Sequence, residues 1–201
     1  MFKFLKRLIA LIIIIIFIGY RLVIIHENVK KVLQYHDLVQ NTLAENGSEA
    51  NVHLVLSMIY TETKGDAIDV MQSSESISGT TNSITDSHTS IKHGVTLLSQ
   101  NISQAKKAKV DVWTAVQAYN FGSSYIDYVA DHGGENSIEL AKNYSKNVVA
   151  PSLGNYNGDT YFYYHPLALI SGGKLYKNGG NIYYSREVQF NLYLIKIMEL
   201  F

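Results

Sequence analysis

One carboxylate, Glu62, directly follows an apolar run and precedes a loop of small polar residues. Burial against apolar neighbours raises the pKa of a carboxyl group, because its charge is poorly solvated there. The C-terminal end of a helix also disfavours negative charge. An acid that keeps its proton near neutral pH can protonate the leaving oxygen of a glycosidic bond. Glu62 is therefore a candidate general acid; the alternative is an ordinary solvated residue just past a buried helix.

Amide and tyrosine side chains occur in two later motifs. Gln72 belongs to "MQSSES" (71–76), and Tyr119 and Asn120 belong to "AYNFG". Amides donate hydrogen bonds to, and accept them from, sugar hydroxyls and N-acetyl groups. Tyr119 offers a flat face and a hydroxyl for a pyranose ring. Each motif taken singly also fits a polar loop, or a helix end with a buried tyrosine.

A second carboxylate is not evident, although glycoside hydrolysis usually uses two, whose separation sets the stereochemistry. Acidic residues of the loop after Glu62 are the candidates: Asp66, Asp69, Glu75 and Asp86. One acid suffices when the substrate's own C6 hydroxyl closes a 1,6-anhydro ring. The sequence slightly favours such a single-acid mechanism and leaves the hydrolysed product open.

Other chemistries find little support in the sequence. No His-Glu-x-x-His pattern occurs, and His88 and His93 are badly spaced for one helix face, so no metal or other cofactor is expected. Phosphate-loop and nucleophile-elbow motifs are missing too. Lys plus Arg and Asp plus Glu are both 17, so nucleic acid is not an expected partner. The sequence indicates no particular protein partner.

The N-terminus predicts a membrane anchor. Three basic residues, Lys3, Lys6 and Arg7, precede an apolar run that continues past Arg21 to Ile25. This is close to the ~20 residues that a helix needs to cross a bilayer. The basic cluster should stay in the cytoplasm, so the chain is expected to be single-pass with its C-terminal part outside the cell. Because no small-x-small cleavage site follows, an uncleaved anchor is favoured over secretion after signal cleavage.

The expected organisation is an anchor at 1–25, a connecting helix and linker at 26–50, and one domain at 51–201. Helical periodicity or apolar runs predict helices at 26–45, 52–62, 91–106, 111–120, 123–149 (broken at Gly133-Gly134) and from 181 onward. Residues 63–90 and 151–164 are expected to be loops. Residues 175–184 fit either a hairpin or part of the last helix. The fold class is therefore mainly α.

The order of these motifs resembles the lysozyme-like superfamily, which includes goose-type lysozymes and lytic transglycosylases. The nearer likeness is to the lysozyme-like domain of Gram-positive cell-wall hydrolases. Four segments carry the resemblance: "MQSSES" (71–76), "SIKHGVTLL" (90–98), "AVQAYNFGSSYIDYV" (115–129) and "LYKNGGNIYYSREV" (175–188). The resemblance implies a lysozyme-like helical domain behind the anchor, and a helix after the Gly-Gly pair.

The resemblance also implies an activity, namely cleavage of peptidoglycan strands between N-acetylmuramic acid and N-acetylglucosamine. Glu62 falls at the position of the catalytic acid/base. The implied substrate contacts are Gln72, Ser73, Ser74, Tyr119 and Asn120. The sequence departs from the family at Thr63-Lys64-Gly65, where Ser-Gly-Gly is common, and at Val70, where proline is common. The competing hypothesis is a non-catalytic, membrane-tethered glycan-binding or cell-wall assembly protein, which would have no need of Glu62.

Overall fold

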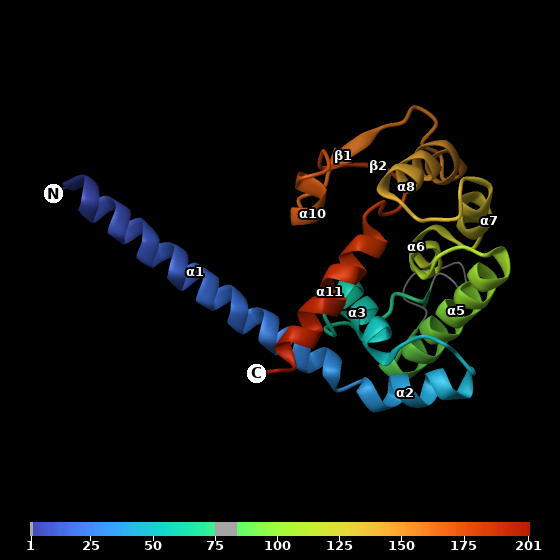
Figure 1. Cartoon of the computed structure of the whole chain (residues 1–201), viewed down its shortest axis with the longest axis horizontal. Helices are drawn as coiled ribbons and strands as arrows, with labels where there is room; N and C mark the ends of the chain where they lie inside the picture. Colours follow the sequence, from blue (N-terminus) through green and yellow to red (C-terminus); the bar gives the residue numbers. More distant parts are fainter. Residues whose placement is uncertain (1, 75–83) are drawn as a thin grey trace.

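The protein is a helical domain on a long N-terminal helix (Figure 1). The computed structural model describes residues 2–74 and 84–201. Helix α1 (Phe2–Leu33) is unbroken, and it contains an 18-residue apolar stretch with a mean hydropathy of 3.0 and no buried residue, which fits a membrane span. The predicted mainly α fold behind an apolar helix is confirmed.

The last two turns of α1 belong to the domain rather than to a linker. Val29 and Val32 are buried in the same core cluster as residues of α3 and α11. A short turn at Gln34–Tyr35 then leads to α2 (His36–Glu45). The helix predicted at 26–45 is therefore divided between α1 and α2, and no break separates the apolar span from the part that packs on the domain.

Helices α3 (Val52–Thr63) and α11 (Tyr184–Met198) pack against each other at the centre of the domain (Figure 1). Asn51 caps α3 by accepting a hydrogen bond from the His53 amide. Every residue from Leu54 to Tyr60 is buried. The apolar run of the sequence thus forms a central helix, as its pattern predicted.

Among the described residues, five further α-helices and a π-helical segment complete the body of the domain. They are α5 (Ser87–Ala108), α6 (Val112–Phe121), α7 (Ser124–Asp131), α8 (Ile138–Tyr144), the π-helical segment η1 (Ser145–Val149) and the short α9 (Ala150–Ser152). The Asp111 carboxylate caps α6 by accepting from the Trp113 and Thr114 amides. Gly122, at a φ of 88°, ends α6 after Phe121.

A small two-stranded sheet replaces part of the loop predicted at 151–164. Strand β1 (Thr160–Phe162) pairs antiparallel with β2 (Lys174–Tyr176), and α10 (Pro166–Leu169) lies between them in the sequence. Because β2 pairs with β1, the Asn-Gly-Gly segment is not the turn of a hairpin but the connection to α11. That helix begins at Tyr184, slightly later than predicted.

Candidate active site

Glu62 lies in the last turn of α3, half-buried, with the chain turning sharply just after it. Lys64 adopts a left-handed conformation with a φ of 56° and ends the helix. The Thr63 hydroxyl donates to the Val70 carbonyl at 2.9 Å, so the loop that leaves α3 returns to its end. The predicted position of Glu62, at the boundary between the core and a polar loop, is what the fold provides.

Burial raises the pKa of the Glu62 carboxyl from 4.5 to about 7. The nearby Tyr184 hydroxyl works against this rise, while the negative charges of Asp69 and Glu187 add to it. At neutral pH a substantial fraction of Glu62 is therefore protonated, which is the state that a general acid needs.

Two stacked tyrosines form one wall beside Glu62. The rings of Tyr119 (α6) and Tyr184 (α11) are 6.3 Å apart and inclined by only 6°. The Tyr119 hydroxyl donates to the Met71 carbonyl at 2.9 Å, whereas the buried Tyr184 hydroxyl makes no well-formed hydrogen bond among the described residues. Burial, with the negative charge of Glu62 adding to it, holds the pKa of both phenols well above 10, so they stay neutral.

The buried carboxylate of Asp69 organises the loop that carries "MQSS". It accepts hydrogen bonds from the backbone amides of Ser73 and Ser74 at 2.9 and 3.0 Å. It also accepts from the hydroxyls of Ser74 and Ser90 at 2.6 and 2.7 Å. Burial alone would raise the pKa of Asp69, but these hydrogen bonds outweigh it and lower the pKa. Asp69 is therefore an ionised anchor of the loop.

The three predicted binding residues of this loop have different environments. Ser73 and Ser74 are buried against Asp69, so they shape the loop. Gln72 is exposed, adopts a left-handed φ of 50°, and donates from its side chain to the Asp69 carbonyl at 3.0 Å. Direct contact of these side chains with a substrate stays a prediction.

Asn120 connects α6 to the turn before α11. Its side-chain oxygen accepts from the Asn181 amide at 2.7 Å. Gly180 makes this approach possible, because a Cβ there would lie 2.8 Å from the same oxygen. Among the described residues, the side-chain nitrogen of Asn120 has no hydrogen-bond partner, so it is available to donate to a ligand. The predicted sugar contact is untested.

Glu187 is a carboxylate that the sequence reasoning missed. It is buried in α11, three residues after Tyr184, and accepts from the Tyr163 hydroxyl and the Asn181 side chain at 3.2 and 3.1 Å. His165 lies 3.5 Å from its other oxygen. A glutamate on the core-facing side of an apolar helix was the available signal.

Two of the other acidic candidates are exposed and engaged elsewhere, and one falls outside the described residues. Asp66 is exposed and pairs with Lys31 of α1 at 2.6 Å, and Asp86 is the exposed N-cap of α5. Glu75 falls in the segment that the structure does not describe. No cluster of three or more histidine, aspartate or glutamate side chains suited to a metal occurs in residues 2–74 and 84–201.

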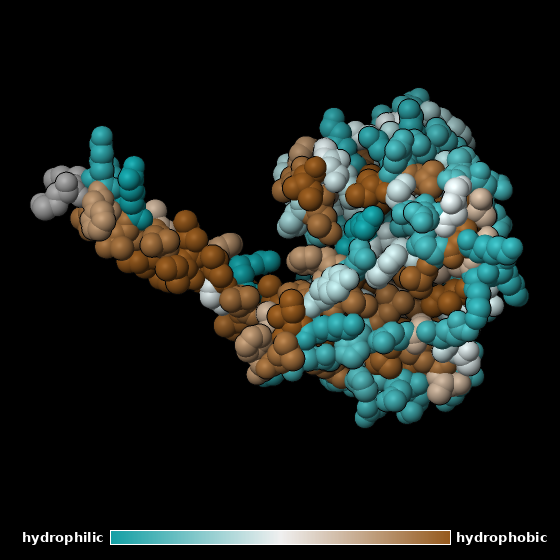
Figure 2. Space-filling view, viewed as in Figure 1, coloured by the Kyte–Doolittle hydropathy of each residue, from teal (hydrophilic) through white to brown (hydrophobic). Residues whose placement is uncertain are grey.

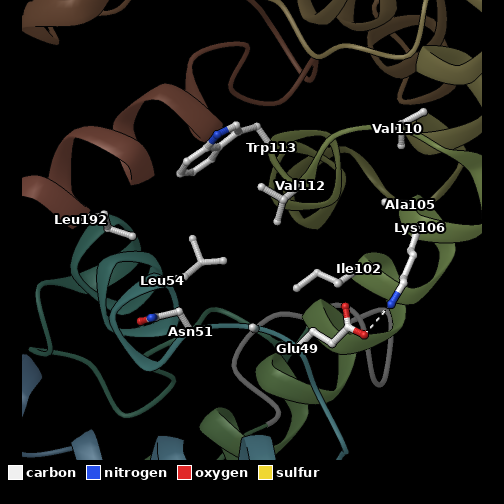
Figure 3. A pocket seen from close by; sticks show the side chains of 11 residues that line it. Glu49, Asn51, Leu54, Ile102, Ala105, Lys106, Val110, Val112, Trp113 and Leu192 are labelled. Atoms are coloured by element: carbon white, nitrogen blue, oxygen red, sulfur yellow. Dashed lines mark hydrogen bonds and ion pairs between the residues drawn. The ribbon is translucent and has the colours of Figure 1, made fainter.

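A separate apolar pocket opens at the other end of α3 (Figure 3). Leu54, Ile102 and Trp113 line it, and the Glu49–Lys106 ion pair lies at its edge. Leu54 precedes Glu62 by two helical turns, or about 12 Å. This pocket is therefore distinct from the carboxylate site.

The chain belongs to the lysozyme-like family, whose model matches residues 29–192. It is 67% identical over 201 residues to a Streptococcus pyogenes protein named pneumococcal vaccine antigen A homolog, and the match covers all of both chains. A Bacillus subtilis bifunctional muramidase/DL-endopeptidase, CwlT, is 32% identical over 142 residues, which are 71% of this chain and 42% of CwlT.

A crystal structure from Staphylococcus aureus, described as similar to lipoprotein of the NLP/P60 family, has the same fold. It superposes with a TM-score of 0.72 at 33% identity, covering 81% of this chain and 52% of the other. The resemblance to the lysozyme-like domain of Gram-positive cell-wall hydrolases is thereby confirmed.

Proposed function

We propose that this protein cleaves peptidoglycan glycan strands between N-acetylmuramic acid and N-acetylglucosamine, with Glu62 as the general acid and base. The observation that carries the proposal is the half-buried Glu62 carboxyl with its pKa raised to about 7, at the rim of a polar loop. Membership of the lysozyme-like family and similarity to a muramidase support the same activity.

The chemistry needs two successive proton transfers through Glu62. Protonated Glu62 donates to the glycosidic oxygen as the bond from that oxygen to C1 of the muramic acid breaks. The resulting carboxylate then accepts a proton from the group that attacks C1. If that group is the substrate's C6 hydroxyl, the product is a 1,6-anhydro sugar; if it is water, the product is a reducing end.

The environment of the neighbouring carboxylates favours a mechanism with a single acid. Asp69 is fully engaged in holding the loop by hydrogen bonds from serines and backbone amides. Glu187 is buried behind Tyr163 and Asn181. Because Asp69 is held by these hydrogen bonds and Glu187 is buried, we propose that neither activates water and that the product is the anhydro sugar.

Mass spectrometry of peptidoglycan digested by the purified protein tests this function. We expect anhydro-muropeptides from the wild type and their loss in Glu62→Gln. Glu45→Gln, at an exposed helix end, is the matched control and should keep the wild-type products. Full cleavage by Glu62→Gln would refute the assignment. Strand binding without cleavage by the wild type would instead favour a glycan-binding protein.

We also propose that α1 anchors the protein in the cell membrane with the domain outside. The helix is apolar over the required length, follows a basic cluster, and continues without a break into the core. Fractionation of cells tests this location. Recovery of a shortened chain from the medium, with none in the membranes, would show a cleaved signal peptide instead.

A further inference from the structure

Apolar side chains are exposed on the segment that carries β1 and α10, residues 160–170, which we call the β1–α10 lobe. Tyr164 and Ile170 are 81% and 83% exposed. The remaining exposed apolar and aromatic residues of the lobe are Tyr161, Phe162 and Leu169. Figure 2 shows apolar surface on this lobe. A group of exposed apolar side chains usually marks a surface that binds another protein or a membrane.

The lobe lies beside the membrane helix. Tyr164 and Pro166 line the same cavity, of about 390 Å³, as Arg21 and Ile25 of α1. In Figure 1 the lobe occupies the side of the domain from which α1 emerges. Arg21 and Ile25 mark the outer end of the apolar run, where a spanning helix passes from hydrocarbon into the headgroups. The lobe is therefore level with the outer membrane interface.

No hinge separates the membrane helix from the domain. Helix α1 is continuous to Leu33, and its last turns bury Val29 and Val32 in the core. Lys31 pairs with Asp66 at 2.6 Å, and a Cβ at Gly65 would lie 3.2 Å from the Lys31 backbone. The orientation of α1 in the bilayer consequently sets the depth of the lobe.

We propose that the β1–α10 lobe inserts its exposed side chains into the outer leaflet as a second membrane contact. Tyrosine is favoured at the headgroup level, and short apolar segments bind there by burying aliphatic and aromatic side chains. The lipid surface is the occupant that the position of the lobe requires, because the lobe adjoins the span itself. A second copy of the chain is the competing occupant.

The contact has a consequence for the substrate, which rests on the proposed function. The loop after Glu62 contacts α1 at Lys31, ten residues beyond Arg21. At 1.5 Å per residue this is about 15 Å along the helix. With two contacts holding the domain to the leaflet, the acid is confined to glycan close to the membrane surface.

Fluorescence quenching in vesicles tests the contact with the full chain. The protein has no cysteine, so Ile170→Cys provides one labelling position, with Val23→Cys in α1 as the membrane reference. The exposed Asp131→Cys, at the end of α7, is the aqueous control. Nitroxide-bearing lipids should quench the dye at 170 at least fivefold more than the dye at 131, and comparably to the dye at 23.

Two outcomes would overturn the contact. One is equal quenching at positions 170 and 131. The other is self-quenching at 170 that needs no nitroxide lipid and disappears when the protein is diluted in the bilayer, which would show a surface between copies. Because neither measurement uses catalysis, the result is independent of the proposed glycan cleavage, although it requires the proposed membrane anchor.

Raising the domain above the membrane tests whether Glu62 is confined to glycan near the membrane surface. An 18-residue charged, alanine-rich helix inserted between Leu22 and Val23 adds five whole turns, about 27 Å. The same insert between Lys3 and Phe4 is the matched control. The raised variant should cut short lipid-linked glycan strands in its own vesicle at least tenfold more slowly, and released strands at the control rate. Equal cutting of lipid-linked strands would refute confinement. A wild type that cuts neither substrate would refute the proposed function instead.

Discussion

Replacing Glu62 with glutamine should remove activity and stabilise the fold at the same time. Glutamine keeps the shape of the side chain but has no proton to deliver. General acid catalysis is typically worth ~100- to 10,000-fold, and the cleavage rate should fall by that order. The stability gain follows from the carboxyl that is replaced, because folding holds this group in an environment that opposes its charge.

The magnitude follows from the shift of the Glu62 pKa. Folding raises that pKa from 4.5 to about 7. Between these values the folded wild type binds more protons than the unfolded chain, so its free energy of unfolding falls as pH rises. A shift of about 2.5 units corresponds to roughly 3 kcal/mol. The free energy of unfolding of Glu62→Gln has no such dependence on pH. Its advantage over the wild type should therefore grow by roughly 3 kcal/mol between pH 4.5 and pH 8.

Urea unfolding of residues 26–201, followed by circular dichroism from pH 4.5 to 8, measures the difference between the two proteins. All other titrating groups are common to both and cancel. Glu45→Gln, at an exposed helix end, should show no pH-dependent gain. A constant difference between Glu62→Gln and the wild type across this range would refute the raised pKa and remove the main support for Glu62 as the acid.

Three further outcomes are expected. Tyr184→Phe removes a hydroxyl that lowers the pKa of Glu62, so the fall of activity as pH rises through about 7 should shift to higher pH in a pH–rate profile. Asp69→Asn leaves the serine donors of the loop, which now bond a carboxylate, facing a neutral amide. This variant should lower the free energy of unfolding by about 2–3 kcal/mol in urea titrations. It should also raise KM for glycan strands. A fragment 50–201 lacks the buried Val29 and Val32 of α1, so it should show a less cooperative thermal transition by circular dichroism than 26–201.

The local part of the site could be predicted from the sequence. The apolar run at 52–62 indicated a buried helix, and a carboxylate at its end follows from the residue numbers alone. Burial of Leu54–Tyr60 agrees with that expectation. The apolar N-terminal helix was equally clear. Both predictions depend on short-range periodicity, which the sequence displays directly.

The small sheet and the exact helix limits were not predictable in this way. Strands β1 and β2 are three residues each, too short for an alternating pattern, and they pair across α10. The Asn-Gly-Gly segment satisfied the hairpin pattern, but the partner of β2 came from elsewhere in the chain. Turn chemistry shows where a chain can reverse and does not show what pairs with the strands beside it.

A helical domain behind an apolar N-terminal helix, with Glu62 at the end of a buried helix, could be inferred from the sequence alone. The groups that set the pKa of Glu62 became evident only from the folded structure. Tyr184 and Glu187 approach Glu62 from α11, and Asp69 is held in a serine-lined loop, although no sequence pattern distinguished Asp69 from its acidic neighbours. The physical reason is that burial and hydrogen bonding of a polar group depend on segments distant in the chain, whose meeting is fixed only when the core packs.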